Sequence, residues 1–122
     1  MKTLIIFLIL LLPAGSTFAG GKIFGAGNIS CEIYLDAYKD QTSEQTVFLS
    51  ILSWCTGYLT AFSAFSQNDL GHPTDSDIAI WVKDYCTGHP ADNMFKATEK
   101  LIEVTAAKIE AKNKATKEQS NK

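Results

Sequence analysis

The 122-residue sequence contains no arginine. Arginine supplies the planar cation that nucleic-acid sites use to bind phosphates and bases, and lysine does not reproduce that geometry. The chain is also mildly acidic, with a formal net charge of -2. The missing arginine and the acidic balance together argue against a nucleic-acid partner.

Histidine and cysteine are scarce, with two and three copies. His72 and His89 each lie beside a proline in a loop, and no cysteine, histidine or carboxylate pair has the spacing of metal ligands. Cys55 falls in an apolar stretch, where a cysteine is usually a small core residue rather than a nucleophile. Asp75 and Asp77 are better explained as charges at a helix start. We therefore expect no enzyme activity, catalytic residue, metal site or cofactor.

Residues 1–19 have the three-part pattern of a secretory signal peptide. Lys2 precedes nine apolar residues, Leu4–Leu12, and the small residue Ala19 follows a break at Pro13. A membrane-spanning helix needs about 20 apolar residues, so an uncleaved anchor is the weaker alternative. The pattern predicts cleavage after residue 19 and a periplasmic location for the mature chain.

The mature chain is long enough for one domain with a modest core. It carries ten lysines against 13 acidic residues, so its net charge is about -3 at neutral pH. In strong acid the lysines, the histidines and the amino terminus bring the charge to about +13, and such self-repulsion loosens compact or dimeric states. Residues 20–28 contain four glycines and are predicted to be a flexible arm.

Residues 29–112 predict a small all-α bundle of about four helices, because apolar residues recur there at helical spacing and no strand pattern is present. The starts are marked by a serine cap, two capping boxes and a proline. The first helix follows the cap Ser30. The second begins at Thr42, which forms a capping box with Gln45, and ends at about Ser66. The third follows Thr74, which forms a capping box with Asp77, and the fourth begins at Pro90. Residues 113–122 lack large apolar side chains and are predicted to be a disordered tail.

The second helix has no charge between Glu44 and Asp69, so a transmembrane helix is an alternative there. Serines and threonines recur along it at three- and four-residue spacing, and no basic cluster flanks it. These features favour a buried central helix that touches water on one side, and no membrane span in the mature chain. Small residues at 53, 57 and 61 would let another helix approach closely.

Cys31, Cys55 and Cys86 allow three disulfide pairings, and the residues alone leave the choice open. In an oxidising compartment two of them are expected to pair. The segments Ser30–Asp36 and Trp81–Cys86, the latter followed by Pro90, resemble the two cysteine segments of HdeA/HdeB-type periplasmic proteins. That resemblance covers roughly residues 30–105 and implies a Cys31–Cys86 disulfide, which would staple the bundle. It also implies a non-enzymatic dimer that unfolds in acid and holds denatured client proteins.

A second resemblance lies in the central helix, where Cys55-Thr56-Gly57-Tyr58 is similar to the Cys-x-Gly-Tyr stretch of Rap/Tai-type immunity proteins. Those are small periplasmic helical proteins that neutralise peptidoglycan amidases, so this resemblance implies an inhibitor of one cell-wall hydrolase. A structural periplasmic domain is the third alternative. The partner is therefore a protein, either unfolded clients or one enzyme, and the residues specify no protein-binding site and leave a homodimer open.

Overall fold

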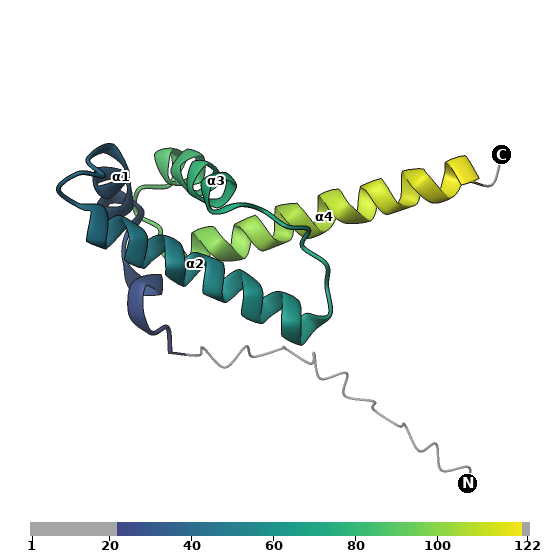
Figure 1. The fold of residues 1–122 in the computed structure, drawn as a ribbon, viewed down its shortest axis with the longest axis horizontal. Coiled ribbons are helices and arrows are strands. Elements are labelled where there is room, and N and C mark those ends of the chain that lie inside the picture. The colour runs from purple at the N-terminus through teal and green to yellow at the C-terminus, as the bar shows by residue number, and fades with distance from the viewer. Residues whose placement is uncertain (1–21, 121–122) are drawn as a thin grey trace, which may run out of the picture.

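A computed structural model describes residues 22–120, so the predicted signal peptide lies outside the described residues. The predicted all-α, disulfide-stapled bundle of four helices is confirmed, and residues 22–120 contain no strand. The elements are a short 3-10 helix and four α-helices (Figure 1): η1 Gly25–Asn28, α1 Cys31–Lys39, α2 Gln45–Ser66, α3 Asp75–Gly88 and α4 Met94–Ser120.

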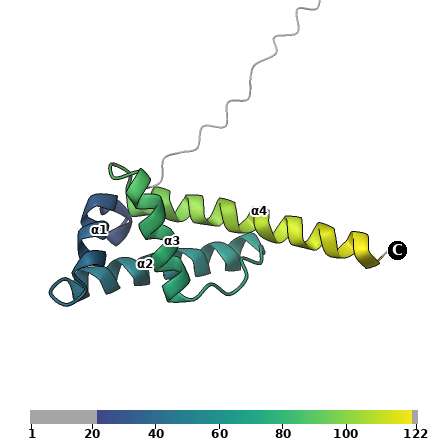
Figure 2. The ribbon, with the colours of Figure 1, turned by 90° about the horizontal axis from the view of Figure 1, so that it is seen from above.

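The core lies among α1, α2, α3 and the first turns of α4. Helix α2 contacts α1, α3, α4 and η1, and α3 also packs against α1 and α4. The largest fully buried side chains come from all four helices, namely Tyr34, Ile51, Met94 and Val82. The second half of α4 extends well beyond the other helices in both views (Figures 1 and 2).

Two of the predicted helix starts are confirmed. The Ser30 hydroxyl accepts a hydrogen bond from the Ile33 N–H, and Thr74 with Asp77 forms the full capping box. The predicted capping box of Thr42 and Gln45 is wrong, because the second helix begins at Gln45, after Glu44, without a side-chain cap. The N–H and hydroxyl of Ser43 instead donate to the Asp40 carboxylate, which organises a turn before the helix and lowers the pKa of Asp40.

The prediction that Pro90 begins the fourth helix is wrong, because α4 begins at Met94. Residues 90–93 form a turn whose backbone carbonyls accept hydrogen bonds from the first turn of α1. The N–H groups of Cys31 and Glu32 donate to the carbonyls of Asp92 and Pro90, at 2.7 and 3.3 Å. The N–H groups in the first turn of a helix have no partner inside that helix. The turn supplies acceptors for two such groups of α1, which explains why residues 90–93 form a turn and not the start of α4.

The predicted disordered tail is helical as far as Ser120, where the described residues end. Every residue from 111 to 120 is exposed, so packing does not hold this part of α4. Its alanines, lysines and glutamates are strong helix formers. Glu110, Lys114 and Glu118 also follow one another at the four-residue spacing that favours ion pairs on a helix. The composition therefore supports an isolated helical extension.

The predicted flexible arm is also wrong for its described part, because η1 packs against α2 and α4. Gly27 is buried, and a Cβ there would overlap the Trp54 ring and lie 2.7 Å from Ile23. The Trp54 indole N–H donates to the Phe24 carbonyl at 2.9 Å. The glycine is needed for this close approach, not for chain flexibility.

Candidate functional site

The disulfide between Cys31 and Cys86 joins the first residue of α1 to the last turn of α3. This is the pair that the resemblance to HdeA/HdeB-type proteins implies. Both cysteines are fully buried, and one turn further along α1 the Tyr34 hydroxyl donates to the Ala79 carbonyl of α3 at 2.8 Å. The staple and this hydrogen bond therefore hold α1 against α3.

Cys55 is buried in the core, as the sequence predicted, and is not part of a disulfide. The Thr98 hydroxyl donates to the Met94 carbonyl at 2.7 Å, and its oxygen lies 3.4 Å from the Cys55 Sγ. Burial raises the pKa of the Cys55 thiol, so the sulfur stays protonated at neutral pH. A cysteine nucleophile reacts as the thiolate, so this thiol lacks the activation that such chemistry requires.

His72 and His89 have different neighbours in the structure. His89 stacks on Tyr85, with ring centroids 4.3 Å apart, and its Nδ1 lies 2.9 Å from the Tyr85 carbonyl. His72 lines a cleft of about 460 Å³ between α2 and the α2–α3 loop, together with Asp69 and several hydroxyl side chains. Within residues 22–120 no three His, Cys, Asp or Glu side chains are grouped as metal ligands.

The hydroxyls in that cleft donate to partners other than His72. Thr56 donates to the Asp75 carboxylate at 3.1 Å, Thr60 donates to the Thr56 carbonyl, and Ser63 donates to the Asn68 carbonyl. A catalytic hydroxyl is activated by a base within hydrogen-bonding reach. Of the three hydroxyls, Thr56 alone donates to such a base, the Asp75 carboxylate, and none of the three donates to His72.

Helix α2 leaves an exposed surface that we call the uncharged face. Only five of the 22 residues of α2 are buried. The uncharged face consists of exposed residues on one side of the helix, which are Thr46, Leu49, Ser50, Ser53, Gly57, Thr60, Ala61, Ala64 and Phe65. Phe65 is 90% exposed and Leu49 is 48% exposed. The predicted buried central helix is therefore central but largely uncovered, and its water-facing side carries apolar residues as well as serines.

By length and composition α2 is also the one helix of residues 22–120 that is suited to cross a membrane, and 28% of its most apolar window is buried. In the described chain its other side packs on four elements of the bundle. This packing is what a core helix of a water-exposed domain needs. The expectation of no membrane span stays a prediction.

An aromatic cluster closes the seam between α2 and α4 beside the uncharged face. Trp54 and Tyr58 are stacked with centroids 5.3 Å apart, and Phe95 packs edge-on against Tyr58. The Tyr58 hydroxyl donates to Glu99 at 2.6 Å. Burial and this bond raise the pKa of Tyr58 to about 12, so its ring stays neutral. A shallow apolar cavity of about 410 Å³ is lined by residues of α2 alone, from Tyr58 to Ser66, and includes Phe65.

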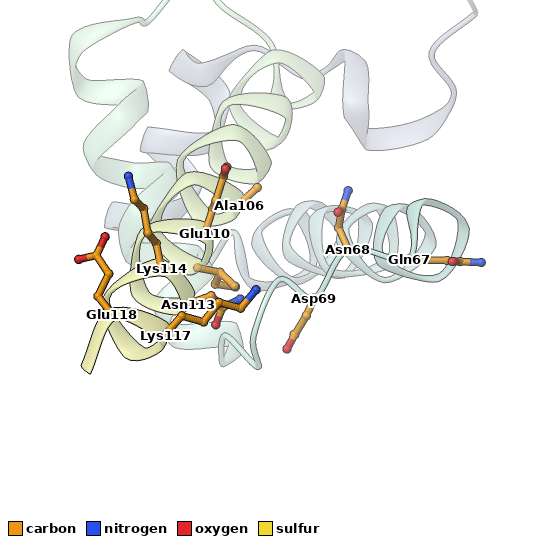
Figure 3. Close-up of a pocket in the computed structure, with 10 residues that line it drawn as sticks. Gln67, Asn68, Asp69, Ala106, Glu110, Asn113, Lys114, Lys117 and Glu118 are labelled. Carbon is orange, nitrogen blue, oxygen red and sulfur yellow. The ribbon is translucent and has the colours of Figure 1, made fainter. Parts of the chain in front are cut away.

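A groove of about 670 Å³ lies beside the extension of α4. Figure 3 shows Gln67, Asn68 and Asp69 on one side and α4 side chains on the other. The α4 side contributes charges of both signs, including Glu110, Lys114 and Lys117. Ile109 is the one large apolar residue in the lining. Such a groove suits a polar or charged segment of a partner better than a small apolar ligand.

The sequence analysis did not identify the uncharged face as a surface. It placed Cys31 and Cys86 correctly as the disulfide pair, and it left the protein-binding residues unspecified. The exposure of Phe65 was the missing information. Comparison of the chain with models of known protein families, with curated proteins and with solved structures finds no match.

Proposed function

We propose that this chain is an exported, non-enzymatic protein that binds unfolded client proteins through the uncharged face of α2. One observation carries the proposal. A helix without charge from Gln45 to Ser66 leaves Leu49 and Phe65 exposed on one side. Large apolar side chains exposed on an uncharged surface mark a candidate site for binding other proteins. Unfolded proteins offer the complementary surface, which is exposed apolar side chains.

Export is supported by the disulfide. The Cys31–Cys86 bond is buried in the core, and disulfides of this kind persist in oxidising compartments such as the periplasm. The predicted signal peptide at residues 1–19 points to the same compartment.

The chemistry of the uncharged face favours many clients over one small ligand. Serines, alanines and a glycine separate its two large apolar residues, so it offers few directional hydrogen-bonding groups. Specific small-molecule sites are concave and carry converging polar groups. A low-specificity apolar surface in the periplasm is what a holdase needs, and the resemblance to HdeA/HdeB-type proteins implies the same activity.

The experiment measures suppression of client aggregation by light scattering as the pH falls from 7 to 2. The probe is the purified mature protein mixed with acid-unfolded malate dehydrogenase. We expect aggregation to be suppressed by the wild type and to return with the double variant Leu49→Ser and Phe65→Ser, because these substitutions remove most of the apolar area of the face.

The matched control is Ile80→Ser, because Ile80 lies on α3 and is 47% exposed, almost the same as Leu49. This variant should protect the client as well as the wild type does. A wild type that fails to suppress aggregation at any pH contradicts the holdase proposal. Equal loss in the double variant and in the control contradicts the assignment to α2.

A second candidate function, inhibition of one cell-wall hydrolase, is favoured by the extension of α4. This helix extends past the bundle with exposed residues from 111 to 120, and it forms one wall of the charged groove (Figure 3). A rigid charged element of this kind suits a single complementary partner. The test is binding of the mature protein to a purified peptidoglycan amidase. Lys114→Glu with Lys117→Glu should abolish an inhibitory complex, whereas the double variant in α2 should not.

A further inference from the structure

The cleft between α2 and the α2–α3 loop opens onto the uncharged face. Thr60 and Ala64 belong to that face and also line the cleft. Much of the remaining lining is apolar and buried, because it includes Leu59, Leu70 and Ile78. The volume of about 460 Å³ lies within the range of roughly 300–1,000 Å³ that ligand pockets occupy. The cleft is therefore large enough to receive a side chain from a segment that lies on the uncharged face.

Two carboxylates border the cleft without a lysine partner. Asp69 is an exposed residue of the lining. Asp75 is exposed at the start of α3, and its carboxylate accepts a hydrogen bond at 3.1 Å from the hydroxyl of Thr56, another residue of the lining. The ion pairs within residues 22–120 join four lysines to carboxylates other than these two. The border of the cleft thus carries negative charge that no lysine of the described chain neutralises.

Other titratable groups near the cleft do not change this balance. Asp69 also lines the groove beside α4, together with Lys114 and Lys117, but neither lysine forms an ion pair with it. His72 is the remaining titratable residue of the cleft lining and is counted as neutral at pH 7. The cleft is therefore suited to a positively charged group from outside the described chain.

An apolar lining with a negative border fits the side chain of lysine or arginine. Both residues bury an aliphatic stem against apolar surface and keep the charged head in water. In this cleft the stem would contact the leucines of the lining, and the head would lie beside the two carboxylates. An acidic side chain would be repelled by the same carboxylates, so the cleft discriminates by the sign of the charge.

The position of Leu49 adds a second point of contact. Leu49, Thr56 and Thr60 lie on one side of α2, because they follow one another at spacings of seven and four residues. Leu49 therefore precedes the two threonines by about 10–17 Å along the helix axis. An extended chain covers that distance with about three to five residues. A client segment with an apolar residue at this separation from a lysine or arginine reaches both places at once.

We propose that the cleft binds a lysine or arginine side chain of an unfolded client, while an apolar residue of the same segment packs on the uncharged face at Leu49. This inference rests on the proposed function and adds a class of substrate to it. The preferred substrates are apolar segments that carry a cation nearby, and equally apolar segments with an acidic residue in its place bind more weakly.

The experiment measures dissociation constants by fluorescence anisotropy at pH 7 and low ionic strength. The probe is a labelled, serine-rich peptide in which two leucines precede one lysine by four residues. A second peptide carries acetyl-lysine at that position, which keeps the stem and removes the charge. We expect the wild type to bind the lysine peptide about two- to fivefold more tightly than the acetylated one, which is the range for exposed ion pairs.

Asp69→Asn combined with Asp75→Asn should remove this preference. Both substitutions keep an oxygen that accepts the hydrogen bonds from Gly71 and Thr56. The matched control is Glu32→Gln, because Glu32 is, like Asp75, an exposed carboxylate in the first turn of its helix. This control should keep the full preference. Circular dichroism checks that the variants keep their helices, and Asp69→Asn alone should show a smaller loss in the same direction.

Equal affinity of the wild type for the two peptides overturns this inference, as does binding of neither peptide. A preference that survives in the protein with both asparagines overturns the assignment to the cleft. Tighter binding of the acetylated peptide also overturns it and would assign the cleft to an apolar side chain. The proposed function fails by a different result, which is that Leu49→Ser with Phe65→Ser suppresses client aggregation as well as the wild type does.

Discussion

The hydroxyl of Tyr34 donates a hydrogen bond to the carbonyl of Ala79, 2.8 Å away and 45 residues further along the chain. Tyr34 is almost completely buried, and burial raises the pKa of its phenol, so the donor is permanent at any physiological pH. This bond and the Cys31–Cys86 disulfide leave the same side of α1, one turn apart, and both end on α3. Helix α1 is therefore attached to the bundle by two links of different chemistry.

Removal of the Tyr34 hydroxyl should weaken the first link alone. Tyr34→Phe keeps the ring in the core and loses the bond, so we expect unfolding free energy to fall by about 0.5–1.5 kcal/mol. Tyr34→Ala also empties the space of the ring and should cost about 3–5 kcal/mol. Urea denaturation of the oxidised proteins measures both values. Equal losses in the two variants would show that the ring contributes nothing.

Loss of the disulfide should cost more stability than loss of the Tyr34 hydroxyl in Tyr34→Phe. The bond closes a loop with a sequence separation of 55 residues. In the chain-entropy model such a closure contributes about 4 kcal/mol. We expect Cys31→Ala with Cys86→Ala to lower the urea midpoint strongly, and Cys55→Ser, which leaves the bond intact, to lower it less. An unchanged midpoint in the double variant would contradict the role of the staple.

Gly27 should tolerate no side chain, in contrast to Gly88. Gly27→Ala drives a methyl group into Trp54 and Ile23, so we expect η1 to shift and the stability to fall by about 1–3 kcal/mol. The Trp54 emission should move to longer wavelength as the ring gains contact with water. Gly88→Ala meets open space and should leave the emission unchanged. Identical spectra for the two variants would show that η1 does not pack on Trp54 in solution.

Acid should destabilise the fold in part through Asp92. Its carboxylate accepts bonds from Lys96 and Tyr85, which lower the pKa of Asp92 below its unfolded value. A lowered folded pKa means that the stabilisation is present above about pH 4 and is lost as the pH falls further. Asp92→Asn should therefore be less stable than the wild type at pH 7, and the difference should disappear near pH 2.

Denaturant midpoints at pH 7, 5, 3 and 2 measure this convergence. Glu118→Gln, on the exposed end of α4, is the control and should follow the wild type at every pH. A difference between Asp92→Asn and the wild type that stays constant down to pH 2 would show that the pair with Lys96 does not respond to acid.

The starts of α1 and α3 could be predicted from the sequence, because each start depends on residues close by in the chain. Ser30 caps Ile33, and Thr74 pairs with Asp77, both within one turn. The start of α4 was not predictable in this way. Pro90 and Asp92 bind the N–H groups of Glu32 and Cys31, nearly 60 residues away, so tertiary contacts override the preference of proline for a first helical turn.

The uncharged face was not predictable either, for a different reason. Helix α2 is apolar on most sides, so periodicity does not say which apolar positions the bundle covers. Phe65 continues the helical spacing of the apolar residues of α2 and is nevertheless the most exposed large apolar residue described. The helix of the C-terminal tail was not predicted, because a segment without large apolar residues lacks the apolar face by which helices are recognised. Its alanines, lysines and glutamates nevertheless favour an exposed helix.

The most direct test of the account is photo-cross-linking with p-benzoylphenylalanine in place of either Leu49 or Ile80, two residues of nearly equal exposure. The labelled protein is illuminated with acid-unfolded malate dehydrogenase, and the masses of the adducts are measured. We predict adducts with the client from position 49 and almost none from position 80. Equal yields from the two positions, or none from either, would contradict a client-binding role for the uncharged face.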